Sequence, residues 1–167
     1  MELYILRHGI AVEPGTPGYE TDAERPLTPE GERKLRQIAE AMEALELSFD
    51  LILSSPYQRA RQTAEIIAES LRARKKLELS DTLTPGGSTT KLVELLNRLK
   101  PSPENVLMVG HEPYLSGLIS LLVSGKEHFA VVMKKGGLCK LSTESLKHGR
   151  CATLEWLLTP KQMALMA

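Results

Sequence analysis

The sequence predicts an α/β fold, a three-layer sandwich in which a mainly parallel central sheet carries helices on both faces. Short apolar runs alternate along the chain with segments whose apolar residues recur every three or four positions. This alternation is typical of strand–helix–strand units, which build parallel sheets, while strands that follow one another late in the chain allow antiparallel pairs there. With 167 residues, of which 42% are hydrophobic, the chain is long enough for one core, so we expect a single domain over 1–167.

The first strand is expected at Leu3–Leu6, and a loop containing Gly and Pro follows over Glu13–Pro26. The stretch "LTPEGERKLRQIAEAMEAL" then predicts a helix. Thr28 has the side chain of an N-cap, and Pro29 suits the first helical position. Apolar residues at spacings of three and four continue to Leu45 and give this helix one apolar face.

Two more strand–helix pairs are expected in the middle of the chain. "DLILSSP" is a buried strand that ends at Ser54 or Ser55, and Pro56 opens the helix "PYQRARQTAEIIAESLRAR". A short strand at Leu77–Leu79 precedes a "TPGG" loop and a helix over about 88–99, which begins with a capping serine.

The last third of the chain begins with "ENVLMVGHEP", which predicts a strand, a turn and the start of a helix that continues through Leu122. Three later strands are expected at Phe129–Met133, Leu138–Leu141 and Cys151–Leu157. The tail "KQMALMA" indicates a loose terminal helix.

The composition excludes several classes of protein. Lys plus Arg and Asp plus Glu both number 21, so the neutral chain has no general attraction for nucleic acid or an anionic membrane. Neither a leader-like N-terminus nor an apolar run of membrane-spanning length is visible, and we expect a cytoplasmic protein. Cys139 and Cys151 form no CxxC motif and are expected to be reduced thiols.

Three segments share one pattern, in which an apolar strand runs into a tight polar turn: "YILRHG", "LILSSPYQRARQT" and "VLMVGHEP". Ligands of open parallel sheets bind beyond the carboxyl ends of the strands, so these turns should bring Arg7, His8, Arg59 and His111 to one crevice. Each residue alone is typical of a solvated surface or a helix cap. Together, two guanidiniums and two imidazoles favour an anion, and phosphate fits because the planar fork of arginine matches its oxygens.

The motifs "LRHG", "SSPYQRARQTAE" and "VGHEP", in this order, resemble the three signatures of the histidine phosphatase superfamily, which has the phosphoglycerate mutase-like fold. The compact size and the stretches "ERPLTPEG" and "LTPGG" are similar to the SixA-type phosphohistidine phosphatases within it. The likeness runs from Met1 to about Leu158.

The resemblance implies a role for each residue. His8 would be the nucleophile that takes the phosphoryl group onto a ring nitrogen. Arg7, Arg59 and His111 would bind the phosphoryl oxygens and stabilise their charge, and Arg25 in the long loop would add to the pocket.

The chemistry of these residues supports the same roles. A neutral imidazole is a good nucleophile at pH 7, since its ordinary pKa is about 6.5. Its second nitrogen needs an acceptor, which we expect to be a backbone carbonyl near Gly9, and we also place Gly9 among the substrate-contacting residues. Water then hydrolyses the phosphohistidine, without a metal or another cofactor.

The sequence departs from the superfamily at one informative place. Many members have a glutamate after the third strand as general acid for an alcohol leaving group, but here the stretch is "DTLTPGG". Imidazole, with a conjugate acid near about 6.5, leaves more easily than an alkoxide, which resembles hydroxide at about 15.7. The absent acid therefore favours a P–N bond as substrate. Asp22 and Asp81 are alternative acids, or simply loop and capping residues.

The sequence thus predicts a phosphatase for phosphohistidine in proteins, with a partner such as a phosphotransfer domain reaching a site covered at most by the loop Glu13–Pro26. A phosphatase or mutase for small phosphorylated molecules and a phosphate-binding module without turnover are the alternatives. His128 and His148 are expected to be structural. A lysine of the "MKKGG" turn, Lys134 or Lys135, could lie near the pocket rim.

Overall fold

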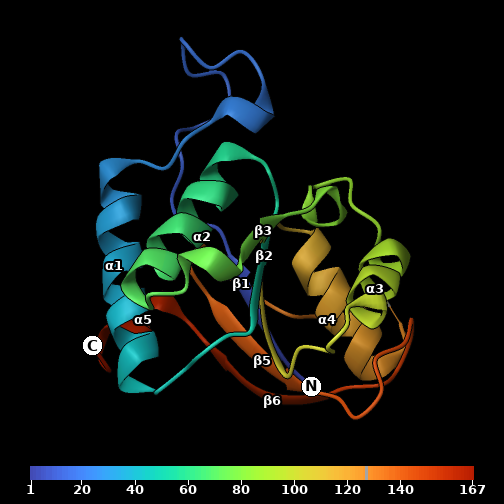
Figure 1. The fold of residues 1–167 in the computed structure, drawn as a ribbon. Helices are drawn as coiled ribbons and strands as arrows, with labels where there is room; N and C mark the ends of the chain where they lie inside the picture. The colour runs from blue at the N-terminus through green and yellow to red at the C-terminus, as the bar shows by residue number, and fades with distance from the viewer. Residues whose placement is uncertain (127) are drawn as a thin grey trace.

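The computed structural model describes residues 1–126 and 128–167 and contains a six-stranded mixed sheet between two layers of helices (Figure 1). The strand order is β3-β2-β4-β1-β5-β6. The predicted three-layer sandwich, with antiparallel strands late in the chain, is confirmed. The parallel strands are β1 (Glu2–Arg7), β2 (Leu51–Ser54), β3 (Leu77–Leu79) and β4 (Asn105–Gly110); the antiparallel ones are β5 (Leu138–Ser142) and β6 (Thr153–Leu158).

Each face of the sheet has its own apolar core. Successive side chains of a strand point to opposite faces, so Leu6 packs into one core and Ile5 into the other. One face is covered by α1 (Pro29–Ala44), α2 (Gln58–Ser70) and α5 (Pro160–Ala164), and the other by α3 (Thr89–Arg98) and α4 (Tyr114–Ser124) (Figure 1). The described residues also form three short 3₁₀ helices: η1 (Asp22–Glu24), η2 (Arg74–Lys76) and η3 (Asp81–Leu83).

The helix starts follow the expected capping chemistry with one small shift. The Thr28 hydroxyl accepts a hydrogen bond from the Gly31 N–H and Pro29 begins α1, as predicted. Ser88 caps α3 in the same way. α2 begins at Gln58 rather than at Pro56, because the chain stays extended through its N-cap residue.

The strand predicted at Phe129–Met133 is wrong: this segment is irregular. Both edges of β1 are already occupied by β4 and β5, so the segment has no free sheet edge beside it. Its Met133 carbonyl instead accepts a hydrogen bond from Arg7, and the Met133 side chain is buried in the core beneath α3 and α4. The last strand also begins two residues later than expected, at Thr153, because the N–H of Cys151 donates to a carbonyl of α4.

The topology places the three polar turns that follow β1, β2 and β4 at one end of the sheet. β1, β4 and β2 are parallel neighbours, with Arg7 paired to Gly110 and Ser54 paired to Val109. Their following turns therefore meet beyond the carboxyl ends of the strands. The loop between β1 and α1 projects at this end, and its η1 segment packs against α2 (Figure 1).

The cysteines and the lengths of the helices complete the description of the fold. Cys139 and Cys151 are free thiols, the first buried and the second half-buried. In the described part of the chain, none of the helices is long and apolar enough to cross a membrane.

Candidate active site

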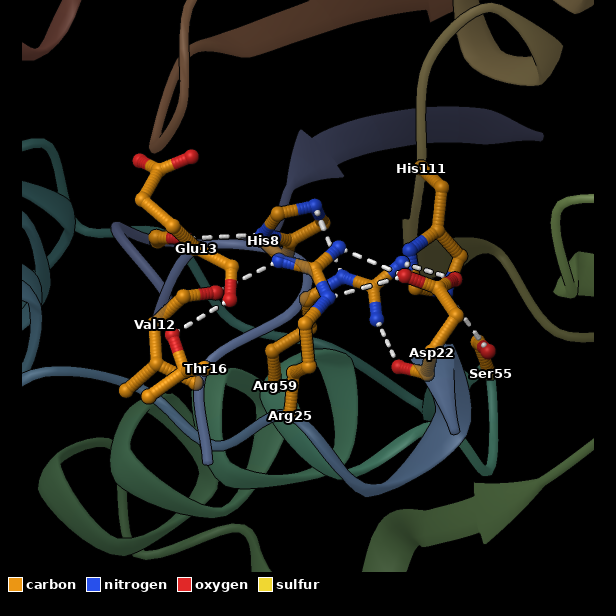
Figure 2. A network of polar contacts seen from close by, with 10 residues as sticks. His8, Val12, Glu13, Thr16, Asp22, Arg25, Ser55, Arg59 and His111 are labelled. Carbon is orange, nitrogen blue, oxygen red and sulfur yellow. Dashed lines mark hydrogen bonds and ion pairs between the residues drawn. The ribbon is translucent and has the colours of Figure 1, made fainter. Parts of the chain in front are cut away.

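Four side chains from three strand ends lie together in the structure: Arg7, His8, Arg59 and His111. The ring centroids of the two histidines are 5.1 Å apart, and the Arg59 Nε atom lies 3.2 Å from His8 Nε2 (Figure 2). His8, Arg59 and His111 are all buried, with exposed fractions of 6%, 3% and 1%. A buried cluster of cationic and imidazole groups is costly without an anion; Asp22 pairs with Arg59, and the remaining donors suit an anionic ligand.

His8 is presented in the form that a nucleophile needs. Its Nδ1–H donates to the Gly9 carbonyl across 2.7 Å, which leaves a lone pair on Nε2. Burial lowers the pKa of His8 to about 3 against the opposing effect of that hydrogen bond, and the charges of Arg59 and Arg7 lower it further. The imidazole is therefore neutral at pH 7, with Nε2 available toward Arg59.

Gly9 serves His8 through its backbone carbonyl. Its carbonyl accepts from His8, and its N–H donates to the Thr63 hydroxyl across 3.1 Å. Both polar groups of Gly9 already have partners inside the protein, and its expected contact with substrate stays a prediction. Thr63 is fully buried and donates its own proton to the Arg59 carbonyl, one helical turn earlier. Neither contact of Thr63 was predicted from the sequence, although a threonine four positions after the arginine on the same helix is the signal for them.

The turn after Met133 braces the end of β1. The Arg7 Nη1 atom donates to the Met133 carbonyl across 2.8 Å, and the Gly136 N–H donates to the Arg7 carbonyl across 3.0 Å. Gly136 adopts a φ of +78°, which explains a glycine at this position. The same turn brings Lys135 close enough for its charge to add to burial in lowering the pKa of His8.

The loop before α1 closes over Arg59 through Asp22. The Asp22 carboxylate accepts from Arg59 across 3.0 Å and from Arg25 across 2.6 Å, and Arg25 also donates to the Val12 carbonyl (Figure 2). The Asp22 backbone carbonyl accepts a second hydrogen bond from Arg59. Arg25 thus reaches the site through Asp22.

The two carboxylates considered as general acids differ in position. Burial alone would raise the pKa of Asp22, but the hydrogen bonds from Arg25 and Arg59 outweigh it and lower the pKa. Asp22 is consequently an ionised carboxylate at neutral pH, which has no proton to donate. Asp81 begins η3, and no hydrogen bond joins its side chain to the four clustered residues in the part of the chain that the structure describes.

Two nitrogen atoms in the cluster have no partner among the described residues: Arg7 Nε and His111 Nδ1. An unsatisfied buried N–H costs about 1–3 kcal/mol, so such donors normally meet an acceptor. A tetrahedral oxyanion beside His8 Nε2 offers several acceptor oxygens. The cluster is therefore suited to hold a phosphoryl group against the lone pair of His8.

The remaining histidines lie outside the cluster. His148 contacts Thr89 at the exposed N-terminus of α3, and His128 lies beside Tyr114 in a shallow surface hollow. Among residues 1–126 and 128–167, no group of three His, Cys, Asp or Glu side chains is arranged to hold a metal ion.

The chain belongs to the histidine phosphatase superfamily, branch 1, whose family model matches residues 3–84. Its fold is that of the phosphoglycerate mutase-like SixA structures. It is similar to the structure of the protein histidine phosphatase SixA complexed with tungstate, with a TM-score of 0.81 and 25% identity over 96% of this chain and 98% of that one.

Two relatives extend this likeness in sequence. Over 127 residues the chain is 29% identical to phosphohistidine phosphatase SixA of Escherichia coli, covering 75% of this chain and 76% of that protein. Over 142 residues it is 36% identical to an uncharacterized protein of Picosynechococcus, covering 84% of each.

Proposed function

We propose that this protein removes the phosphoryl group from phosphohistidine in proteins, with His8 as the covalent nucleophile. One observation carries the proposal: the neutral His8 Nε2 faces Arg59, while two nitrogen atoms without a partner among the described residues, Arg7 Nε and His111 Nδ1, lie in the same buried cluster. Phosphoryl transfer needs positioning and charge stabilisation above all, and these groups supply both.

The reaction proceeds in two steps, phosphoryl transfer to His8 and hydrolysis of the phosphorylated His8. In the first, the substrate phosphohistidine reacts with a proton on its free ring nitrogen: His8 Nε2 attacks phosphorus, the P–N bond of the substrate breaks, and the substrate leaves as a neutral imidazole. Arg59 transfers its hydrogen bond from His8 to a phosphoryl oxygen as the new P–N bond forms. In the second step water attacks the phosphoryl group on His8, which releases inorganic phosphate and restores the neutral imidazole.

The leaving group supports a P–N substrate. Asp22 is ionised beside its two arginines, so the site offers no carboxylic acid there to protonate an alkoxide. An imidazole leaves with far less help. The cluster is buried beneath the η1 loop, and the Asp22 side chain that pairs with Arg59 is 50% exposed, so a histidine carried on another protein, such as a phosphotransfer domain, displaces this carboxylate to reach His8.

The test compares substrates and one active-site variant. Wild type is assayed with a phosphohistidine-bearing protein, phosphoramidate, phosphoserine and sugar phosphates, and His8→Ala is assayed beside the surface control His148→Ala. We expect turnover of the P–N substrates, little of the phosphomonoesters, and loss of activity only in His8→Ala, with both variants folded by circular dichroism.

Three results would contradict the proposal. Equal rates on phosphoserine would remove the P–N preference, and preference for a sugar phosphate would favour a metabolic phosphatase or mutase. Saturable phosphate binding without acid-labile label on His8 would indicate a binding module.

A further inference from the structure

Ser55, directly after β2, makes a hydrogen bond to His111 that has no role in the two reaction steps proposed above. Its hydroxyl oxygen lies 2.8 Å from His111 Nε2 (Figure 2). Ser55 is fully buried, and its own N–H donates to the Val109 carbonyl across 3.0 Å, which fixes it to the neighbouring strand. The hydroxyl is therefore held in place by the sheet rather than by a flexible loop.

The surroundings of this hydroxyl determine the direction of the bond. The backbone N–H of Tyr57 donates to the Ser55 oxygen across 3.2 Å, so one lone pair is already taken. The hydroxyl proton still needs an acceptor, and His111 Nε2 provides it. In the opposite arrangement, with a proton on Nε2, the buried hydroxyl proton would have no partner among the described residues, at a cost of about 1–3 kcal/mol.

A proton acceptor at Nε2 requires the proton of a neutral imidazole to be on Nδ1. His111 is neutral at pH 7, because burial and the charge of Arg59 lower its pKa to about 3. Its Nδ1 atom is the one that is buried without a partner, on a ring 5.1 Å from that of His8. A lone pair at this atom would repel a phosphoryl oxygen, whereas an N–H would donate to it.

We propose that Ser55 is a positioning residue that fixes the Nδ1–H tautomer of His111, so that a neutral His111 donates a hydrogen bond to the phosphoryl group. The inference rests on the proposed function in that it takes the ligand to be a phosphoryl group. Tyr57 contributes twice, through its backbone N–H and through its ring, which lies edge-on to His111 with centroids 5.3 Å apart. The polar turn "SSPY" thereby sets the chemistry of a histidine on another strand.

The direct test is the tautomer itself. ¹⁵N NMR of the imidazoles in the wild-type protein at pH 7 distinguishes protonated from bare ring nitrogens, with His111→Asn identifying the signals. We expect a protonated Nδ1 and a bare Nε2 for His111. A bare Nδ1 would overturn the proposal without any reference to variants or to turnover.

Three variants then test the contribution of the hydroxyl. Ser55→Ala should lose the defined tautomer and weaken binding of inorganic tungstate by about tenfold, the value of one charge-assisted hydrogen bond. Ser55→Thr keeps a hydroxyl and should restore both. Ser54→Ala removes the neighbouring buried hydroxyl, which donates to the Ser55 carbonyl, and should leave the tautomer of His111 and the affinity for tungstate unchanged.

These outcomes separate the two proposals. If Ser55→Ala keeps the Nδ1–H tautomer or binds tungstate as wild type does, the role of Ser55 is wrong even if phosphohistidine is turned over. If Ser55→Ala does not fold, the wild-type tautomer and the Ser55→Thr variant still decide. If the wild-type protein shows the expected Nδ1–H tautomer of His111 but no phosphatase activity, only the proposed function is contradicted.

Discussion

The Nε–H of Arg59 meets the Nε2 atom of His8 across 3.2 Å, so a cation caps the nitrogen that we assign as nucleophile. The same guanidinium donates to the backbone carbonyl and the carboxylate of Asp22. Arg59 is thus the point where the nucleophile, the helix α2 and the overlying loop meet. A phosphoryl group entering the site must take over part of these hydrogen bonds.

Replacing Arg59 should therefore damage turnover more than it damages the fold. Arg59→Lys keeps a positive charge but loses the planar fork, and we expect kcat on a P–N substrate to fall by about 10²-fold or more. Arg61→Lys, two residues along the same helix and more than half exposed in an ion pair with Glu65, is the matched control and should keep kcat. Similar losses in both variants would show that the helix, not the guanidinium, is responsible.

Asp22 competes with an incoming oxyanion for two arginines. In Asp22→Asn the carboxylate charge beside Arg25 and Arg59 is removed, and we expect inorganic tungstate or phosphate to bind a few-fold more tightly. Titration calorimetry at low and high salt measures the effect, which should shrink as salt screens the charge. Glu20→Gln, an exposed acidic residue of the same loop, serves as control. Weaker oxyanion binding in Asp22→Asn would mean that Asp22 organises the arginines rather than competing for them.

The buried histidines predict how stability depends on pH. Burial lowers the pKa of both His8 and His111 to about 3, while the unfolded chain has the ordinary value of about 6.5. Between these values the unfolded state binds more protons, so the free energy of unfolding should fall as the pH drops from about 6.5 toward 3. Urea unfolding at several pH values measures how steeply the free energy of unfolding depends on pH. The slope should be smaller in His8→Asn and His111→Asn but unchanged in His148→Asn; equal slopes in all four proteins would contradict the buried, neutral state.

A close backbone approach at the start of α1 gives a stability prediction. A Cβ atom on Gly31 would lie 2.1 Å from the Ile10 carbonyl oxygen, which also accepts from the Thr28 N–H at the edge of the site loop. Gly31→Ala should destabilise the protein by about 1–3 kcal/mol or more, because backbone must move. Gly117→Ala, in α4 with open space around its Cβ position, should be neutral or stabilising by up to about 1 kcal/mol. Thermal unfolding of the two variants measures the difference, and equal unfolding midpoints would contradict the expected clash between a Cβ atom at position 31 and the Ile10 carbonyl.

Local chemistry explains why much of the fold could be predicted. Thr28 and Pro29 begin α1 because a cap and a fixed φ act within one turn. Strands with a continuous apolar run, such as Val106–Val109 in β4, must be covered on both faces, which a parallel sheet between helices achieves. The segment Phe129–Met133 has strand-like composition, yet strand formation requires a free neighbouring edge, and only the sheet order reveals that β1 has none.

The sequence by itself determined that Arg7, His8, Arg59 and His111 would follow strands whose ends meet, because parallel topology places such turns together. Only the tertiary structure decided that Asp22 bridges Arg25 and Arg59, that Thr63 ties down Gly9, and that the Ser55 hydroxyl reaches His111. The physical reason is that the hydrogen-bond partner of a hydroxyl or carboxylate comes from segments that are distant in the sequence and become neighbours only in the folded protein. The tautomer of each imidazole depends on that partner, while burial keeps both rings neutral.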